Sequence, residues 1–540
     1  MNKNLSLSGK HWLLKRPVSA GSDIIDLLRS ERGISDLSSA KLSDPFLFPE
    51  MRTAVERIER AIAAKETVGI FGDYDADGIT GTAQLVRFFR RHDLEPVVHL
   101  PDRAKEGYGM KTLSIDALKE KGVSLIITVD TGIAAHTEIA YAKSLGIDVI
   151  VTDHHRAQGG RPDALAVIHP QIPSEFPNPH LCGSGVAFML VRALEKLQPW
   201  NGIELDIALA ALGTVGDLVP LTGENRLLVI HGLKFLDRLP ESPLKEFVDS
   251  IRGSGPLTAS DIAFRIVPRI NAAGRMAHPM VALEALLNGG ESLEELHRLN
   301  GDRQTFVEEL QEEMIPLLDL SQAFLVLASE RITPGTAGLV AGRLSEKFGR
   351  PSLAAAIIGD IAVASVRSIP EIDLMECLED PAVRPFLRTF GGHAQAAGCT
   401  FNVSFLPALR LALNAVLTER GISAGTLLPT LTLDAQLHHR HVTMSFAKSL
   451  TSLAPFGSGN AEPMFLLSKQ TLTDLRTVGS ESAHLQAKIN GIQAVGFRLG
   501  SHIAELNAET PFDIACRIGV NSWNGRESVQ LVIEDIRKTA

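Results

Sequence analysis

Short apolar runs alternate with amphipathic segments along the chain from about residue 50. The apolar runs have the length and the β-branched content of buried strands, whereas the segments between them repeat apolar residues at the spacing of one helix face. This pattern predicts strands at 67–71, 96–100, 125–129 and 148–152, and helices at 53–64, 79–91, 115–121 and 134–145. Regular alternation of strand and helix predicts a parallel sheet with helices on both faces.

The pattern changes further along the chain. Residues 183–250 are mostly helical in pattern, and 291–319 form a strongly acidic helical stretch, which we interpret as the solvated face of a helix that links two lobes. A second α/β region then follows. In the last part, alternating segments flank the pairs Asn490-Gly491 and Asn524-Gly525, and Asn-Gly is a strong signal for a β-hairpin. Repeated hairpins predict a small β-barrel or sandwich.

These patterns predict an α/β protein of several domains. The length of 540 residues is consistent with three or four domains at roughly 150 residues each. The predicted boundaries are 1–50 for an N-terminal segment, 51–250 for the parallel-sheet domain, 251–322 for a helical linker, 323–425 for the second α/β domain and 426–540 for the β-barrel.

Composition excludes several classes of protein. Hydrophobic residues make up 45% of the chain and charged residues 21%, which excludes a mostly disordered protein. The formal net charge of −10 excludes a protein that coats nucleic acid by bulk positive charge, but not a local basic groove. The four cysteines are far apart and form no CxxC pair, so we predict neither a disulfide framework nor a zinc ribbon.

We expect a cytoplasmic protein that does not enter the membrane. The start of the chain lacks an apolar core long enough for a secretory signal. The most apolar stretch, Leu353–Val366, is interrupted by Asp360 and is too short to span a bilayer.

Acidic and imidazole side chains follow three of the predicted strands. They are Asp73, Asp75 and Asp77 after the first strand, Asp130 after the third, and Asp153, His154 and His155 after the fourth. Because ligands of open α/β sheets bind beyond the carboxyl ends of the strands, we expect these side chains to meet at one rim. Carboxylates packed so closely repel one another and raise each other's pKa values, and divalent cations relieve this conflict.

The residue types indicate the cations and the chemistry. Carboxylates with one or two imidazoles suit Mn²⁺ or Mg²⁺. Two such ions roughly 3.5–4 Å apart are a common device for in-line attack at phosphorus. From these residues we predict phosphoester hydrolysis with two Mn²⁺ or Mg²⁺ ions.

The first acidic motif has two other interpretations. It matches the first half of a calcium-binding EF-hand loop, with Asp at positions 1, 3 and 5 and Gly at position 6. However, the twelfth position is Gln84 instead of Glu, and a strand-like run precedes the loop where an EF-hand has a helix. The aspartates could also cap helices, but capping does not require three of them at alternate positions. A metal centre accounts for all three acidic segments together.

Several motifs resemble the DHH phosphoesterase superfamily. Its first three motifs are similar to AspTyrAspAlaAspGly (73–78), ValAspThrGly (129–132) and AspHisHis (153–155), and the fourth to GlyThrValGlyAspLeuValProLeu (213–221) with Asn225-Arg226. The RecJ single-stranded-DNA exonucleases of this superfamily have motifs similar to ArgIleAsnAlaAlaGlyArg (269–275), GlyGlyHisAlaGlnAlaAlaGly (391–398) and LeuAlaProPheGlySerGlyAsnAlaGluPro (453–463). The resemblance covers nearly the whole chain, and the combination of motifs is specific.

The resemblance implies roles for the matching residues. The implied metal ligands are Asp75, Asp77, Asp130, His154 and Asp217, with Asp73 as a further member of the set. His155 is implied to lie near the scissile phosphate, with Asp153 supporting the two imidazoles. Arg275 and His393 are implied to face substrate phosphates and complete the catalytic group. The implied nucleic-acid-binding set is Asn271, Arg275, Arg367, Ser368, Gly391, Gly392, His393 and Trp523.

By the same resemblance, the second α/β domain is a DHH-associated domain and the terminal barrel an oligonucleotide-binding (OB) fold that grips the strand. Base stacking there could use Phe456, Phe465, Phe497 or Trp523, although aromatic side chains are more often buried in the core. Trp523 stands beside a predicted turn and is the best placed of the four.

The implied activity is metal-dependent degradation of single-stranded DNA from 5′ to 3′ to mononucleotides, in DNA recombination and repair, by a monomer. Single-strand-binding protein and a helicase are partners by family analogy. Two alternatives remain open. One is a DHH phosphodiesterase for short oligoribonucleotides or cyclic dinucleotides, which would not need the C-terminal β region. The other is a non-catalytic DNA-binding replication scaffold, which should have lost acidic positions that this chain retains.

Overall fold

The strands of the alternating region form a parallel sheet in the computed structural model, in the order β3-β2-β4-β5-β6. They are β2 (Val68–Gly72), β3 (Val97–His99), β4 (Leu125–Val129), β5 (Asp148–Thr152) and β6 (Ala166–Ile168). The first four lie where the sequence predicts strands. The edge strand β6 was not predicted, because a run of three residues is too short to stand out from its surroundings.

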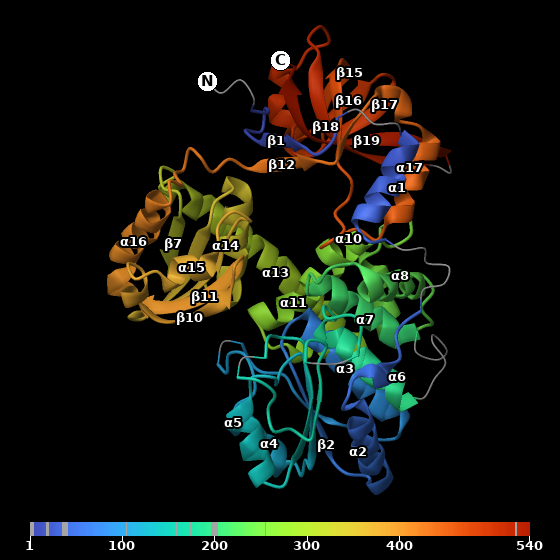
Figure 1. Ribbon diagram of the computed structural model, residues 1–540, viewed down its shortest axis with the longest axis vertical. Coiled ribbons are helices and arrows are strands. Elements are labelled where there is room, and N and C mark those ends of the chain that lie inside the picture. The colour runs from blue at the N-terminus through green and yellow to red at the C-terminus, as the bar shows by residue number, and fades with distance from the viewer. Residues whose placement is uncertain are drawn as a thin grey trace. The chain divides into compact units, whose positions relative to one another are not determined.

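Helices cover both faces of this sheet, as predicted. They are α2 (Met51–Ala64), α3 (Ala76–Arg91), α4 (Thr112–Glu120), α5 (His136–Ser144) and α6 (Gly183–Glu195). Figure 1 labels β2 of this sheet, with α4 and α5 on one side of it and α2 on the other. On one face, Ile70 and Ile127 belong to a core with α2, α3 and α6. On the other face, Phe71 and Ile126 belong to a core with α4 and α5. Since side chains alternate between the two faces of a strand, covering both faces requires strands that are apolar throughout.

A group of helices follows the sheet. Its members are α7 (Glu204–Gly216), α8 (Gly223–Leu236), α9 (Pro243–Ile251), α10 (Ala259–Asp261), the π-helical turn η2 (Ile262–Ile266), α11 (Val267–Met276), α12 (Met280–Asn288) and α13 (Glu291–Met314). They share a core that includes Leu212, Phe247 and Ile270. The acidic stretch predicted as a helix is α13. Across the described residues, no helix combines the length and apolar character needed to cross a membrane.

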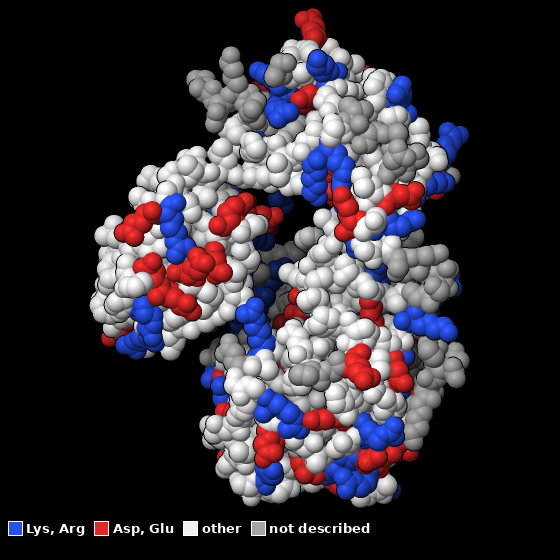
Figure 2. Space-filling view, viewed as in Figure 1, with Lys and Arg blue, Asp and Glu red and all other residues white. Residues whose placement is uncertain are grey.

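The chain divides into two compact units. The parallel-sheet unit comprises residues 32–306 and 455–461, and the mixed-sheet unit comprises 1–31, 307–454 and 462–540. The structure describes residues 5–17, 21–34, 41–103, 105–157, 159–172, 175–195, 204–253, 255–523 and 526–539. Acidic and basic side chains are interspersed over the face shown in Figure 2, consistent with the modest net charge.

The mixed-sheet unit contains a five-stranded sheet in the order β10-β11-β9-β8-β7. Its strands are β7 (Leu325–Ser329), β8 (Ser352–Ile358), β9 (Ile361–Arg367), β10 (Leu387–His393) and β11 (Ala396–Asn402), and its helices are α14 (Pro334–Phe348), α15 (Leu374–Glu379) and α16 (Leu406–Glu419). β7 and β8 are parallel, and the other pairs are antiparallel. Leu353 and Val366 pack with α15 and α16 in its core.

The C-terminal region is a seven-stranded sheet in the order β13-β14-β18-β19-β17-β16-β15. Its elements are β13 (Ala435–Leu437), α17 (Met444–Leu450), β14 (Phe465–Gln470), β15 (Leu472–Val478), β16 (His484–Ile489), β17 (Ile492–Gly496), β18 (Phe512–Trp523) and β19 (Arg526–Lys538). Asn490 and Gly491 join β16 to β17 with φ of 49° and 82°, as a tight hairpin turn requires. The pair at 524–525 lies outside the described residues, but the strands on either side of it pair antiparallel.

The N-terminal segment packs onto this C-terminal region. β1 (His11–Leu14) pairs in parallel with β12 (Thr430–Leu433), and α1 (Gly21–Glu31) follows it. Trp12 is buried and donates a hydrogen bond from Nε1 to Asp535 Oδ2 at 3.0 Å. The Arg537 guanidinium lies 4.6 Å from the Trp12 ring centroid. The start of the chain therefore contributes to a domain formed mainly by its end.

Trp12→Ala should destabilise the C-terminal β region by about 3 kcal/mol or more, because it removes a buried aromatic ring and leaves Asp535 without its indole donor. Hydrogen exchange at the amides of β19 measures this loss. Leu13→Ala on the same strand is the matched control, since Leu13 is 52% exposed and its removal should cost less than about 0.5 kcal/mol. Equal protection of β19 in the two variants would contradict the expected role of Trp12.

Candidate metal centre and nucleic-acid site

The three strands that precede the acidic motifs are neighbours in the sheet. β2, β4 and β5 pair in that order, and Asp73, Asp130 and Asp153 each follow one of them directly. β3 lies on the other side of β2, so the order of strands reverses at β2, and such a switch point opens a crevice beyond the strand ends. The three motifs therefore meet at one rim of the sheet.

The first motif joins the end of β2 to the start of α3. Asp75 is the N-cap of α3, and its Oδ1 accepts hydrogen bonds from the N–H groups of Asp77 at 2.9 Å and Gly78 at 3.2 Å. Capping therefore accounts for one of the three aspartates. A strand precedes the motif, so the loop does not have the two flanking helices of an EF-hand.

The start of α6 holds Asp77 in place. Asp77 Oδ2 accepts a hydrogen bond from the N–H of Gly183 at 2.6 Å, and its Oδ1 accepts one from the N–H of Ser184 at 2.8 Å. The positive end of the helix dipole also stabilises a carboxylate there. A Cβ at Gly183 would lie 2.7 Å from Asp130 Oδ1, so only glycine lets α6 approach this closely.

Three buried polar atoms at the rim have no hydrogen-bond partner within the described part of the chain: Asp73 Oδ1, Asp130 Oδ1 and His154 Nε2. The last two lie 3.0 Å apart without the geometry of a hydrogen bond. Asp217 Oδ2 and Asp77 Oδ2 lie 3.6 Å and 3.7 Å from the same nitrogen. Buried polar atoms are costly unless a further group satisfies them.

Three overlapping groups of side chains have ligand atoms within 4.8 Å of one another. They are Asp130 with His154 and His155; Asp77 with His154 and Asp217; and Asp73 with Asp75 and Asp130. Asp217, from the fourth motif, directly follows α7. All six residues predicted as metal ligands occur in these groups, and Asp130 and His154 each occur in two of them.

Burial and mutual repulsion raise the pKa values of carboxyl groups at the rim. Burial, reinforced by Asp77, raises the pKa of Asp130 well above its ordinary value. Burial and the charge of Asp75 do the same for Asp73. The pKa of Asp217 rises to about 9, again through burial first and then repulsion from Asp77. These carboxylates are therefore difficult to keep ionised without a positive charge between them.

The donor set fits divalent cations. Burial lowers the pKa of His154, so that its neutral ring keeps a lone pair for a metal. A cation would satisfy the unpartnered atoms of Asp73, Asp130 and His154 and would offset the repulsion between the carboxylates. Carboxylate oxygens with one or two imidazole nitrogens match the preferences of Mn²⁺ and Mg²⁺.

Asp153 differs from the other carboxylates because donors surround it. Its Oδ1 accepts from the N–H groups of His154 at 2.7 Å and His155 at 3.0 Å and lies 2.8 Å from His155 Nδ1, and its Oδ2 accepts from the N–H of Ile133 at 2.9 Å. Burial opposes ionisation, but these bonds outweigh it and lower the pKa of Asp153 to about 2. Burial likewise lowers the pKa of His155, but the bond to Asp153 prevails and raises it to about 9.

Tyr108 lies at the rim but was not among the predicted site residues. Its hydroxyl is 3.2 Å from His155 Nδ1 and donates to the carbonyl of Asp130 at 3.4 Å. Gly107 and Gly109 on either side have φ of 75° and 82°, a conformation that turns the chain sharply around the tyrosine. The Gly-Tyr-Gly triplet was the signal that could have revealed this residue.

α11 lies against the first acidic motif. Asn271 Oδ1 accepts a hydrogen bond from the N–H of Ala76 at 2.8 Å, so this side chain, predicted to bind nucleic acid, holds the start of α3. A Cβ at Gly274 would lie 2.7 Å from the carbonyl oxygen of Tyr74. Arg275 follows in the last turn of α11 and is half-buried.

The other predicted nucleic-acid-binding residues lie in the mixed-sheet unit. Arg367 ends β9 and His393 ends β10, and both are paired with Ala396 of β11, one from each side. The two side chains are thus separated by one strand, about 10 Å across the sheet. Ser368 follows Arg367, and Gly391, Gly392 and His393 are exposed. These five residues form one cluster at the end of the sheet.

The aromatic candidates of the C-terminal region differ in exposure. Phe465 is completely buried, Phe456 is half-buried, and Phe497 is 58% exposed. Trp523 ends β18, and its side chain lies outside the described part of the structure. Among the three that are described, Phe497 is therefore the one available for stacking on a base.

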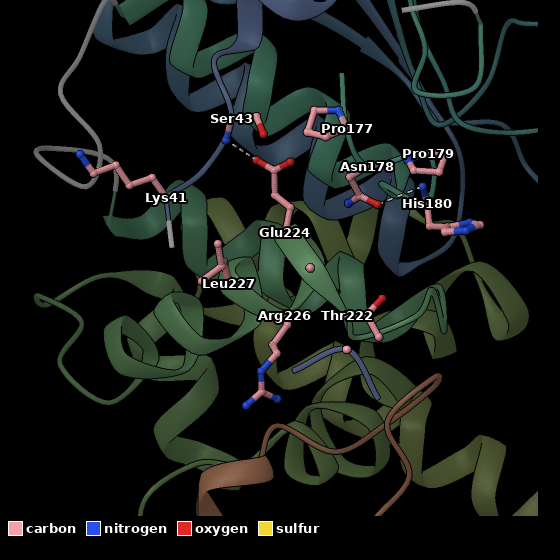
Figure 3. Close-up of a pocket in the computed structure, with 12 residues that line it drawn as sticks. Lys41, Ser43, Pro177, Asn178, Pro179, His180, Thr222, Glu224, Arg226 and Leu227 are labelled. Atoms are coloured by element: carbon pink, nitrogen blue, oxygen red, sulfur yellow. Dashed lines mark hydrogen bonds between the residues drawn. The ribbon is translucent and has the colours of Figure 1, made fainter. Parts of the chain in front are cut away.

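A separate pocket of about 400 Å³ lies at the start of α8 (Figure 3). Glu224 lines it and accepts a hydrogen bond from the N–H of Ser43 at 2.7 Å, and Asn178 Oδ1 accepts one from the N–H of His180 at 3.1 Å. The residues that line this pocket do not include those of the acidic rim. The rim, where the donor set fits a cation, is therefore the candidate centre.

Three segments of the chain match known protein families. Residues 67–214 match the DHH family, N-terminal domain; residues 321–419 match the DHHA1 domain; and residues 433–535 match the RecJ OB domain. These matches confirm the predicted fold class: a parallel-sheet DHH domain, a second α/β domain and a C-terminal OB domain with helices between the first two.

The chain is also similar to whole proteins described as single-stranded-DNA-specific exonuclease RecJ. It is 36% identical to that of Bacillus subtilis over 94% of this chain and 66% of the relative, and 32% identical to that of Salmonella typhimurium over 95% of this chain and 96% of the relative. The fold and rim define a DHH-type protein. The chain belongs to the RecJ family of single-stranded-DNA-specific exonucleases.

Solved structures of RecJ from Thermus thermophilus have the same fold. The complex with Mn²⁺ has a TM-score of 0.84 at 28% identity and covers 100% of this chain and 80% of that chain. The complex with Mg²⁺ has a TM-score of 0.76 at 27% identity and covers 100% of this chain and 79% of that chain. The cations in these homologues are the two that the donor set of the rim favours.

Gly183→Ala should weaken Mn²⁺ binding by about tenfold or more, because the added methyl would displace Asp130 and the N–H that holds Asp77. Titration of the protein with Mn²⁺, followed by electron paramagnetic resonance without DNA, measures the affinity. Gly301→Ala in α13, where a Cβ meets nothing within 4 Å, is the matched control. Unchanged Mn²⁺ affinity in Gly183→Ala would exclude Asp77 and Asp130 as ligands.

Proposed function

We propose that this protein hydrolyses single-stranded DNA with two divalent cations, Mn²⁺ or Mg²⁺, held at the rim by Asp73, Asp75, Asp77, Asp130, His154 and Asp217. The observation that supports this most directly is the set of buried, unpartnered oxygen and nitrogen atoms at the rim of a RecJ-family chain. Cations there would supply Lewis-acid activation of water and offset the charge that develops on the phosphate.

The residues of the chain then have distinct tasks. Asp77 and Asp75 are fixed by backbone N–H groups, so they need no rearrangement to bind a cation. Asp153 keeps His155 oriented and protonated, and the imidazolium would stabilise negative charge on the scissile phosphate. The Tyr108 hydroxyl lies beside the same ring nitrogen, Nδ1, and so also limits the movement of His155.

We propose that each unit has residues that contact the single strand. Arg275 of α11 would bind a phosphate, and Arg367, Ser368, Gly391, Gly392 and His393 at the sheet end of the mixed-sheet unit would bind phosphates as well. The exposed glycines let a backbone approach closely. Phe497, and Trp523 from its place beside the predicted hairpin turn, would stack on bases in the OB domain. Phosphates and the flat faces of the bases are similar in every nucleotide, so the preference for DNA sequence should be weak.

Further properties rest on the family resemblance. By that resemblance, the protein would degrade DNA from 5′ to 3′ and release mononucleotides. It would act as a monomer in DNA recombination and repair, together with single-strand-binding protein and a helicase. A phosphodiesterase for short oligoribonucleotides or cyclic dinucleotides is the less favoured alternative, because residues 433–535 match a RecJ OB domain. A non-catalytic scaffold is disfavoured by the intact acidic rim.

Asp130→Ala should lower cleavage of single-stranded DNA by about 10³-fold or more, because Asp130 contributes to two of the ligand groups. Binding of the same DNA in EDTA should stay close to that of the wild type, since the strand is held mainly by other residues. Release of nucleotides from end-labelled DNA and fluorescence anisotropy measure the two quantities. Wild-type turnover by this variant would refute the metal assignment.

Matched substrates test the polarity and strand preference. They are a free strand, a blunt duplex, a duplex with a 5′ overhang and one with a 3′ overhang. We expect digestion of the free strand and of the 5′ overhang, with a stop near the junction, because paired bases cannot stack on OB aromatics. Efficient digestion of the blunt duplex without a helicase would refute the single-strand preference, and preferential attack on the 3′ overhang would refute the polarity.

A further inference from the structure

One loop lies between elements of the mixed-sheet unit but is built into the parallel-sheet unit. Residues 455–461 come between the 3₁₀ turn η7 (Thr451–Leu453) and β14, yet they group with residues 32–306. They form the centre of the LeuAlaProPheGlySerGlyAsnAlaGluPro motif, which has no part in the reaction proposed above.

This loop contacts the segment that follows Asp217. The N–H of Leu221 donates a hydrogen bond to the carbonyl of Ser458 at 2.8 Å. A Cβ at Gly457 would lie 2.7 Å from Leu221 Cδ1, and one at Gly459, where φ is 68°, would lie 3.0 Å from Pro220 Cβ. The two glycines therefore let the turn pack directly onto Pro220 and Leu221, and a larger residue at either position would push them apart.

The loop is a stiff turn. Gly457 and Asn460 exchange backbone hydrogen bonds of 2.9 Å and 3.1 Å. Asn460 is completely buried, donates from Nδ2 to the carbonyl of Pro455 at 2.9 Å, and accepts at Oδ1 from the Arg32 guanidinium at 2.9 Å. The part of the loop that contacts Pro220 and Leu221 is therefore held in one conformation by these hydrogen bonds.

The opposite side of Pro220 is anchored as well. Asn225 Nδ2 donates to the carbonyls of Pro220 at 3.1 Å and His180 at 2.7 Å, and Asn225 Oδ1 accepts from Asn178 Nδ2 at 2.8 Å. Asn178 and His180 lie beside the start of α8 in Figure 3. Pro220 and Leu221 are thus held between α8 and the loop 455–461.

The connection from this anchor back to Asp217 has little packing of its own. Leu218 has a φ of 59°, which is unfavourable for a residue with a side chain, and is 69% exposed. Asp217 is held on one side by the hydrogen bond from its N–H to the carbonyl of Gly213 at 2.8 Å. On the other side, the N–H of Leu218 donates a hydrogen bond to the carbonyl of Val215 at 3.3 Å, and the chain then runs to Pro220 and Leu221, which the loop 455–461 contacts.

We propose that the loop 455–461 is a positioning segment for Asp217: by holding Pro220 and Leu221, it keeps this carboxylate at the place where a cation binds. The inference rests on the proposed function, because it requires Asp217 to be a metal ligand. It makes cation affinity at the rim depend on a loop that lies between β13 and β14, inside the segment that matches the RecJ OB domain.

The experiment compares full-length variants. Gly457→Ala adds one methyl group against Leu221, which is only 2% exposed and cannot swing away into solvent. Gly425→Ala is the matched control, since a Cβ there meets nothing closer than 4.0 Å. Asn460→Ala weakens the turn without introducing a clash. The double variant Gly457→Ala with Leu221→Val removes the Leu221 Cδ1 atom that the methyl group of residue 457 would meet.

Three quantities are measured for each variant: Mn²⁺ affinity without DNA by electron paramagnetic resonance, affinity for single-stranded DNA in EDTA, and melting temperature. We expect Gly457→Ala and Asn460→Ala to bind Mn²⁺ about tenfold more weakly, with DNA binding in EDTA close to wild type and the melting temperature lowered by only a few degrees. Leu221→Val should restore most of the affinity lost in Gly457→Ala. Gly425→Ala should behave as the wild type.

Other outcomes would overturn the proposal. Wild-type Mn²⁺ affinity in both loop variants would show that the loop does not position Asp217. A loss in Gly457→Ala that Leu221→Val fails to reverse would show that the effect does not pass through this contact. A collapse of melting temperature in both variants would make the loop a general support of the fold. If the wild type itself does not bind Mn²⁺, the proposed function fails instead.

Discussion

Several carboxylates are buried within a few ångströms of one another at the edge of the parallel sheet, and the surrounding structure has to hold them there against their repulsion. It does so in two ways. Asp75, Asp77 and Asp153 each accept two or more hydrogen bonds, mostly from backbone N–H groups. Asp73 and Asp130 keep an oxygen without such a partner. Protein donors stabilise the first group, whereas each carboxylate of the second keeps an oxygen that a cation would satisfy.

Helix N–H groups can reach these carboxylates only because the helices come close to the strand ends. A Cβ at Gly213 of α7 would lie 2.7 Å from Asp77 Oδ1, and one at Gly78 would lie 2.6 Å from the carbonyl oxygen of Asp73. Gly78 of α3, Gly183 of α6 and Gly213 of α7 therefore have no side chain at the places where these three helices surround the rim. The close approach also buries Asp73, Asp77 and Asp130, and interactions between charges are stronger in the protein interior than in water.

The order of segments along the chain is not their order in the structure. β1 completes a sheet with β12 in the mixed-sheet unit, and the loop 455–461 belongs to the parallel-sheet unit. A truncation before residue 455 would therefore remove part of the unit that carries the rim, along with the OB strands. Loss of activity in such a truncated chain could not be assigned to the OB domain alone.

The sequence by itself determined the elements and the chemistry of the rim. β2 and β4 lie within one residue of the runs at 67–71 and 125–129, because buried strands leave a local apolar pattern. The acidic residues follow such runs directly, so a parallel sheet was enough to predict that Asp73, Asp130 and His154 would come together.

Tertiary structure alone decided which groups hold these side chains. The N–H groups of α6 on Asp77, the hydroxyl of Tyr108 beside His155 and the carbonyl of Ser458 on Leu221 join positions from 47 to more than 200 residues apart. Two of these contacts use backbone atoms, which every residue has, so the hydrogen-bonding groups leave no mark in the sequence, and only the glycines that make room for them, Gly183 and Gly457, do. Contacts of this kind depend on how helices and loops pack across the fold, and packing leaves no periodic pattern in the sequence.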